Sequence, residues 1–159
     1  MATISDPRER PIAVFDSGVG GLTVLHELLV HLPAEDYIYL GDTARFPYGE
    51  RAPDELANFS LEIAEELLAR NAKLLVVACN SATSAALPVL QQRMRQTTLG
   101  VEVLGVVRPE AIQAVATTNN GRIGLLATNA TVASGAYDEA IRVADPHVTL
   151  VSVAAQELA

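Results

Sequence analysis

The stretch LLVVACNSATSAAL, residues 74–87, decides the fold class of this chain. Its first five residues are continuously apolar, which is typical of a central parallel strand covered on both faces. Asn80, Ser81 and Thr83 then supply helix N-cap chemistry, and the alanines and leucines after them continue as a helix. The sequence therefore predicts a buried strand that passes directly into a helix, with Cys79 at the junction.

Cys79 is the only cysteine of the chain, and its position favours reactivity. Open α/β sheets bind ligands at the carboxyl ends of their strands. The N–H groups and partial positive charge of a helix N-terminus lower the pKa of a thiol and favour the thiolate. The alternative is structural, because a free cysteine is often a small buried hydrophobe.

The same alternation of strand and helix extends along the chain, which predicts an α/β fold with a parallel sheet and helices on both faces. A lobe boundary is expected between residues 95 and 100, which gives units 1–98 and 99–159, the second of them incomplete. The expected strands are 12–15, 37–40, 74–78, 101–107, 123–127 and 148–153, and the expected helices are 22–32, 53–67, 80–96, 109–116 and 131–143.

Composition excludes several classes of protein. The chain has 159 residues and a net charge of -8, which argues against a nucleic-acid surface built from clustered Lys and Arg. One cysteine excludes an internal disulfide, and no apolar run approaches the ~20 residues that cross a bilayer. The polar start MATISDPRERP is no signal peptide, so we expect a cytoplasmic protein that does not contact membranes.

A glycine-rich turn, DSGVGG at residues 16–21, follows the first strand and opens a helix. Its N–H groups suit an anion, carboxylate or phosphate. Thr23 stands where a dinucleotide fingerprint has its third glycine, and no P-loop lysine follows. Asp16 is placed to relay or orient a proton, or only to cap the helix, and the glycines alternatively serve the turn alone.

Two further strand ends carry polar residues. In the loop 41–53, the Tyr48 hydroxyl and the free main-chain groups at Gly49 are available to bind a ligand. The alternative is an ordinary loop in which Asp42 and Arg45 pair only with each other, a contact of little value at a surface. Thr128 and Thr131 follow the 123–127 strand and bind a ligand or cap the next helix. The three histidines show no metal spacing, so no metal site is predicted.

Four segments in this order and spacing, FDSGVGGLTV, LGDTARFPYGER, VVACNSATS and RIGLLATNATVASGAY, resemble the glutamate racemases of the aspartate/glutamate racemase superfamily. The resemblance implies two similar α/β lobes with glutamate between them, no cofactor, a homodimer, and a D-glutamate product that feeds peptidoglycan synthesis. It also implies two cysteines on opposite faces of the α-carbon, one removing a proton and the other returning one.

The resemblance assigns Cys79 as the first catalytic cysteine, acting on D-glutamate, with Asp16 assisting it. Ser81 stands where the family often has threonine, which keeps the hydroxyl. The positions implied to contact substrate are Asp16, Ser17, Tyr48, Gly49, Asn80, Ser81, Thr128 and Thr131.

The family's second cysteine lies in a Gly-Cys-Thr-His segment that these 159 residues lack. Two-base racemisation needs an acid on the far face of the substrate. The chain is therefore expected to be a partial racemase that is weak or inactive by itself. The alternatives are a racemase of aspartate or another acidic amino acid, a non-catalytic truncated binding protein, and, more distantly, a nucleotide-binding domain.

Overall fold

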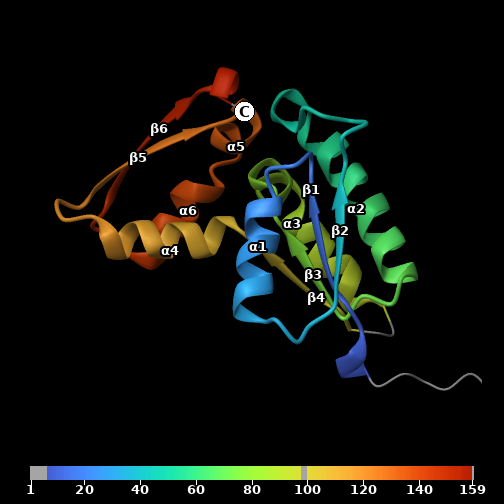
Figure 1. Ribbon diagram of the computed structural model, residues 1–159. Coiled ribbons are helices and arrows are strands. Elements are labelled where there is room, and N and C mark those ends of the chain that lie inside the picture. Colours follow the sequence, from blue (N-terminus) through green and yellow to red (C-terminus); the bar gives the residue numbers. More distant parts are fainter. Residues whose placement is uncertain (1–6, 98–99, 159) are drawn as a thin grey trace, which may run out of the picture.

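A four-stranded parallel sheet forms the centre of the protein in the computed structural model, which describes residues 7–97 and 100–158. The strand order is β2-β1-β3-β4, and each pair of neighbours is parallel, as the sequence predicted (Figure 1). The two central strands are apolar and buried because helices cover both of their faces. The strands of this sheet are β1 (Ile12–Asp16), β2 (Tyr37–Gly41), β3 (Leu74–Val77) and β4 (Glu102–Gly105).

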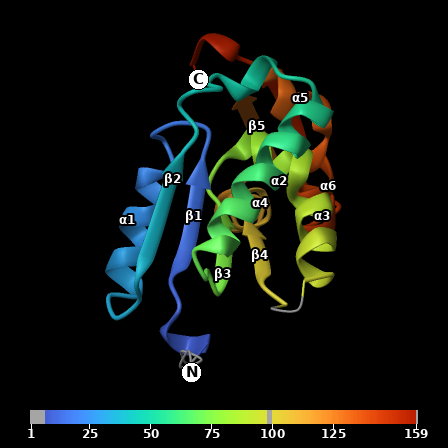
Figure 2. The same cartoon turned by 90° about the vertical axis from the view of Figure 1, so that its right-hand side faces the viewer.

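Helices lie on both faces of this sheet. Helices α2 (Pro53–Ala69) and α3 (Asn80–Arg95) cover one face, and α1 (Leu22–His31) lies on the other (Figure 2). The main core lies between the sheet and the pair α2 and α3. Within α2, Leu56 and Ile63 are buried in this core.

Helix α1 is present as predicted, but its apolar residues are only partly covered. None of its residues, all of which are described, is fully buried, and the exposed fractions of Leu22 and Leu29 are 46% and 47%. The helix packs over β1 with Leu25 and Leu28, and Leu22, Val24 and Leu28 border an open groove.

A smaller parallel sheet follows, formed by β5 (Arg122–Ala127) and β6 (Thr149–Ala154). The single helix expected over 131–143 is wrong, because Gly135 adopts a left-handed conformation with φ of 66° and separates two helices. The helices of this part are α4 (Val107–Thr117), α5 (Asn129–Ser134) and α6 (Ala136–Ala144), and the chain also contains the 3-10 helices η1 (Pro7–Glu9), η2 (Tyr48–Glu50) and η3 (Gln156–Leu158).

The predicted boundary between residues 98 and 99 lies outside the described residues. Beyond it, β4 pairs with β3 in the first sheet, so residues 99–159 do not all belong to the second sheet. The physical reason is the parallel pairing of β4 with β3, in which Glu102 lies opposite Leu74 and β4 forms the edge of the first sheet. The division into two lobes stays a prediction. Within the described ranges, no helix is long and apolar enough to cross a membrane.

Candidate active site around Cys79

The carboxyl ends of the parallel strands bring together most of the predicted site residues. Asp16 ends β1, and Cys79 follows β3 by two residues. Because neighbouring parallel strands end at the same edge of the sheet, Cys79 lies within hydrogen-bond distance of Ser17, the residue after Asp16, although 62 positions separate Cys79 from Ser17. Thr128 directly follows the β5 strand of the second sheet and lies against the same region through Ser81.

Asp16 organises the glycine turn from within. Its buried carboxylate accepts hydrogen bonds from the N–H groups of Gly18, at 3.2 Å, and Gly21, at 3.0 Å. A Cβ on Gly21 would lie 2.7 Å from the Cβ of Asp16, so this turn requires glycine at that position. The expected anion site is thus wrong for these two N–H groups, because a carboxylate of the protein already occupies them.

Cys79 itself caps helix α3. Its Sγ accepts a hydrogen bond from the N–H of Ala82 at 3.4 Å, and its thiol donates to Oγ of Ser17 at 3.5 Å. The expectation that Asn80, Ser81 and Thr83 cap this helix is wrong, because Cys79 is the cap residue. The Thr83 hydroxyl instead donates to the carbonyl of Val77 at 3.0 Å. Ser17 in turn donates to Asp16 at 3.4 Å, which links the thiol to a carboxylate.

Burial raises the pKa of the Cys79 thiol above its ordinary value. The hydrogen bonds of Ser17 and of the Ala82 N–H lower this pKa, and the negative charge of Asp16 raises it. The expectation of a lowered thiol pKa is therefore wrong. The N–H group of the helix end acts in the expected direction, but desolvation of the thiolate outweighs it because only 6% of Cys79 is exposed.

Two substitutions are expected to move the pKa of Cys79 in opposite directions. Asp16→Asn removes a negative charge that disfavours the thiolate, so the pKa should fall and alkylation should become faster at a given pH. Ser17→Ala removes a hydrogen bond that favours the thiolate, so the pKa should rise. The pH dependence of iodoacetamide alkylation, followed by mass spectrometry, measures both. Shifts of both variants in the same direction would contradict this electrostatic account.

Three hydroxyls join the two sheets beside Cys79. Oγ of Ser81 lies 2.9 Å from Oγ1 of Thr128 and 3.4 Å from Oγ1 of Thr131, and the two threonine hydroxyls are 3.0 Å apart. Thr128 also caps α5 by accepting the N–H of Thr131, so the capping alternative is confirmed. A ligand that replaces one of these mutual bonds would meet a ready group of donors and acceptors.

In the loop after β2, the tyrosine hydroxyl is held by a carboxylate of the same loop. Tyr48 is 2% exposed, and its hydroxyl donates to Asp42 at 2.5 Å. Asp42 does pair with Arg45, at 2.6 Å, but the expectation that the two pair only with each other is wrong, because Asp42 is buried and also accepts from Tyr48. A Cβ on Gly49 would lie 2.8 Å from Thr128, so only glycine lets this loop approach the second sheet so closely.

The predictions from sequence gave no place in the site to three residues, of which Asp42 was expected only to pair with Arg45. Asp42 follows the end of β2 just as Asp16 ends β1, and that position was the available signal. Tyr137 and Glu110 form a hydrogen bond to each other, and Tyr137 also contacts Asn80 at 2.9 Å. Nothing in the local sequence indicated this contact, because 27 positions separate Tyr137 from Glu110.

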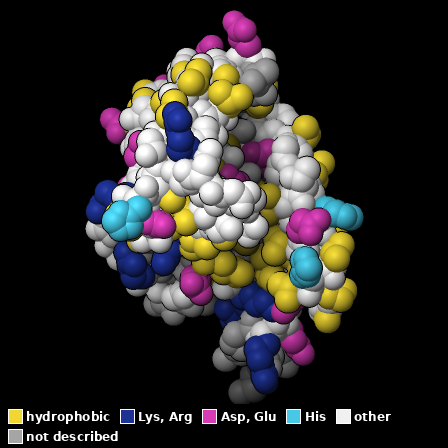
Figure 3. Space-filling view, turned by 90° about the vertical axis from the view of Figure 1, so that its left-hand side faces the viewer, with side chains coloured by type: hydrophobic (Ala, Val, Ile, Leu, Met, Phe, Trp, Pro, Cys, Tyr) yellow, Lys and Arg dark blue, Asp and Glu magenta, His cyan; other side chains and the backbone are white. Residues whose placement is uncertain are grey.

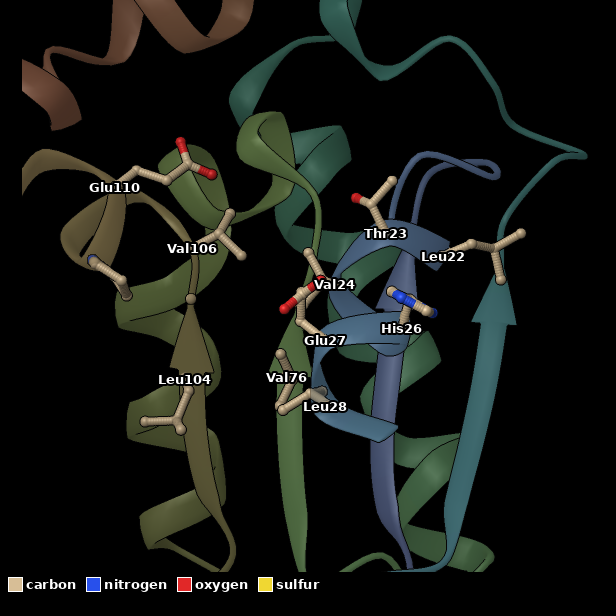
Figure 4. A pocket seen from close by; sticks show the side chains of 12 residues that line it. Leu22, Thr23, Val24, His26, Glu27, Leu28, Val76, Leu104, Val106 and Glu110 are labelled. Atoms are coloured by element: carbon tan, nitrogen blue, oxygen red, sulfur yellow. The ribbon is translucent and has the colours of Figure 1, made fainter. Parts of the chain in front are cut away.

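A polar pocket of about 260 Å³ adjoins these groups. A larger cavity, about 820 Å³, is instead an apolar groove between α1 and β4, lined by Leu28, Val76 and Leu104 (Figure 4). Hydrophobic side chains gather in the middle of the face shown in Figure 3. Among the described residues, no cluster of three His, Cys, Asp or Glu side chains could hold a metal ion. The side chains that line the polar pocket are those of Asn80, Glu110, Leu125, Leu126, Ala127, Thr128, Thr131, Tyr137 and Ala155.

The family model of Asp/Glu/Hydantoin racemase matches residues 20–159 of this chain. The chain belongs to this racemase family. A glutamate racemase of Geobacter metallireducens is 50% identical to it over 143 residues, which are 90% of this chain and 51% of that relative. One from Corynebacterium diphtheriae is 50% identical over 129 residues, 81% of this chain and 47% of that relative. The chain thus spans about half the length of these racemases.

Solved racemases share the fold described above. A glutamate racemase isoform of Bacillus anthracis superimposes with a TM-score of 0.85 and 40% identity, over 92% of this chain and 53% of that one. The glutamate racemase of Francisella tularensis, solved in complex with D-glutamate, gives a TM-score of 0.79 at 34% identity, over 91% of this chain and 52% of that one. These agreements confirm the predicted α/β class of this racemase-family chain.

Proposed function

We propose that this chain carries one half of the active site of a cofactor-independent glutamate racemase, with Cys79 as the group that exchanges the α-proton of D-glutamate. The main support is the hydrogen-bonded series from the Cys79 thiol through Ser17 to Asp16, at 3.5 and 3.4 Å. This series lies at the carboxyl edge of a parallel sheet, where such folds bind ligands. The racemase relatives are consistent with that chemistry.

The series provides a route for the proton that Cys79 must lose before it can act as a base. The thiol proton passes to Oγ of Ser17, and the Ser17 proton passes to Asp16, which leaves a thiolate and a neutral carboxyl group. The thiolate then takes the α-proton of the substrate. Because burial raises the pKa of Cys79, the thiolate is a stronger base once it has formed.

The polar groups around Cys79 suit the two carboxylates and the ammonium group of glutamate. We place Asn80, Ser81 and Thr128 around the polar groups of the substrate. Thr131 supports this arrangement through the hydrogen bond between its hydroxyl and that of Ser81. Tyr48 and Gly49 contribute main-chain groups in this proposal, since the Tyr48 side chain is held by Asp42. Ser17 touches both Cys79 and Asp16, and we propose that it contacts the substrate as well.

Inversion needs a second acid on the opposite face of the α-carbon. These 159 residues contain one cysteine, so we propose that the second thiol comes from residues outside this sequence. The chain by itself should then exchange the α-proton of D-glutamate with solvent on one face and form little L-glutamate.

Deuterium exchange tests this proposal directly. Purified chain is incubated with D-glutamate in deuterium oxide, and proton NMR follows loss of the α-proton while chiral chromatography follows inversion. Exchange with retention supports the proposal, whereas sustained conversion to L-glutamate would refute the two-cysteine mechanism. D-aspartate in the same assay examines the alternative acidic substrate, and the absence of exchange with either would favour a non-catalytic role.

The biological setting is part of the same proposal. The D-glutamate would feed peptidoglycan synthesis in the cytoplasm, and the complete enzyme would be a homodimer. The resemblance to the glutamate racemases is the basis for the peptidoglycan role, the cytoplasmic location and the homodimer. Sedimentation of the purified protein tests whether it forms a dimer.

A further inference from the structure

Three helices bring Asn80, Glu110 and Tyr137 together beside Cys79. Asn80 is the first residue of α3, Glu110 belongs to α4 and Tyr137 to α6. The Tyr137 hydroxyl oxygen lies 2.9 Å from Oδ1 of Asn80 and also forms a hydrogen bond to the Glu110 carboxylate. All three side chains line the polar pocket of about 260 Å³. Figure 4 shows the Glu110 carboxylate pointing away from the apolar side chain of Leu104.

The Tyr137 hydroxyl has one proton and two neighbours that accept one. An ionised carboxylate is only an acceptor, and a hydrogen bond to it is stronger than one to a neutral oxygen. The proton of Tyr137 therefore points to Glu110. Burial and the contact with Glu110 both raise the pKa of Tyr137, so the phenol keeps its proton.

This leaves only lone pairs of the Tyr137 oxygen facing Asn80. Two acceptor oxygens at 2.9 Å have no proton between them, whereas the amide nitrogen of Asn80 can donate to Tyr137. The two ends of an asparagine amide have the same shape, so the hydrogen-bond network decides which end faces which neighbour. The amide nitrogen of Asn80 accordingly faces Tyr137, and its oxygen lies on the opposite side of the amide.

We infer that Glu110, acting through Tyr137, is a positioning residue that keeps the amide oxygen of Asn80 available to accept a hydrogen bond from the ammonium group of an amino-acid substrate. Asn80 is exposed and directly follows Cys79, so a ligand at the thiol can reach it. The inference rests on the proposed function for its ligand, but the orientation of the amide does not depend on any ligand.

The orientation is measured first, on the ligand-free chain. In the isotope-labelled protein, the side-chain amide protons of Asn80, identified by their loss in Asn80→Asp, should show nuclear Overhauser contacts to the Tyr137 ring. Glu110→Gln can donate to Tyr137, which frees the phenol proton for the oxygen of Asn80, and these contacts should weaken. Amide protons of Asn80 that lie far from Tyr137 in the unmodified chain would overturn the inference.

The ligand is tested by titration with D-glutamate and with glutarate, which lacks the ammonium group. Glu110→Gln should weaken D-glutamate binding about 10-fold and leave glutarate binding unchanged. Glu139→Gln is the matched control, because it removes the same charge from an exposed residue that pairs with Arg142 and lies outside the pocket. Equal losses for both ligands would indicate a purely structural role and overturn the inference. Absence of D-glutamate binding together with a correctly oriented Asn80 would refute the proposed substrate instead.

Discussion

Cys79→Ser is expected to lower the rate of deuterium incorporation at the α-carbon of D-glutamate by about a thousand-fold. A serine hydroxyl keeps the size of the side chain and its cap on α3, but it is far less acidic than a thiol. It therefore forms almost no oxyanion at neutral pH, even with Ser17 and Asp16 in place to accept the proton. Proton NMR of the substrate in deuterium oxide measures this rate.

The fold of the Cys79→Ser protein serves as its internal control. Because the substitution is nearly isosteric, its circular dichroism spectrum and midpoint of thermal unfolding should match those of the unmodified chain. Ser17→Ala provides an intermediate case, since it interrupts the proton route but keeps the thiol, and its exchange rate should fall about 10-fold. Unchanged exchange in Cys79→Ser would exclude Cys79 as the base.

Asp42→Ala is expected to lower the free energy of unfolding by about 3 kcal/mol. The buried carboxylate accepts hydrogen bonds from Tyr48, at 2.5 Å, and from Nε of Arg45, at 2.6 Å. Its removal leaves a phenol that is almost completely buried without its acceptor, and a guanidinium group whose remaining carboxylate partner is the exposed Glu62. Urea unfolding followed by circular dichroism gives the difference.

Two variants separate the contributions to this effect. Tyr48→Phe removes only the phenol contact and should cost about 1 kcal/mol. Glu62 is the exposed partner of the same Arg45 guanidinium, and its side chain is 68% exposed. Glu62→Ala should therefore change the free energy of unfolding by less than about 0.5 kcal/mol. A loss for Asp42→Ala no larger than that for Glu62→Ala would show that the loop does not depend on the buried carboxylate.

Much of the fold was predictable because it depends on local patterns. The apolar runs that became β1 and β3 are buried on both faces, and such runs identify central parallel strands without knowledge of their neighbours. The limits of the local pattern appear at Gly135. Its neighbours have helical sequence on both sides, but the glycine adopts a left-handed conformation that divides the predicted helix.

The candidate site divides in the same way. The positions of Asp16 and Cys79 at strand ends followed from the sequence, because parallel strands place their carboxyl ends at one edge. The direction of the pKa shift of Cys79 could not be predicted from the sequence. The helix N-terminus was visible in the local sequence, but the burial of the thiol was not. The hydrogen bond of the Tyr48 hydroxyl was equally unpredictable, because the conformation of the loop brings its acceptor, Asp42, next to it.

The sequence by itself determined the alternation of strand and helix and the single thiol at a strand-to-helix junction. It also placed glycine at positions 21 and 49, where the backbone approaches its neighbours closely. Only the tertiary structure decided which polar groups are already paired, such as Tyr48 with Asp42 and Glu110 with Tyr137. The physical reason is range. Backbone preference and apolar periodicity act within about ten residues, whereas burial and hydrogen bonding depend on segments that folding brings together from distant parts of the chain.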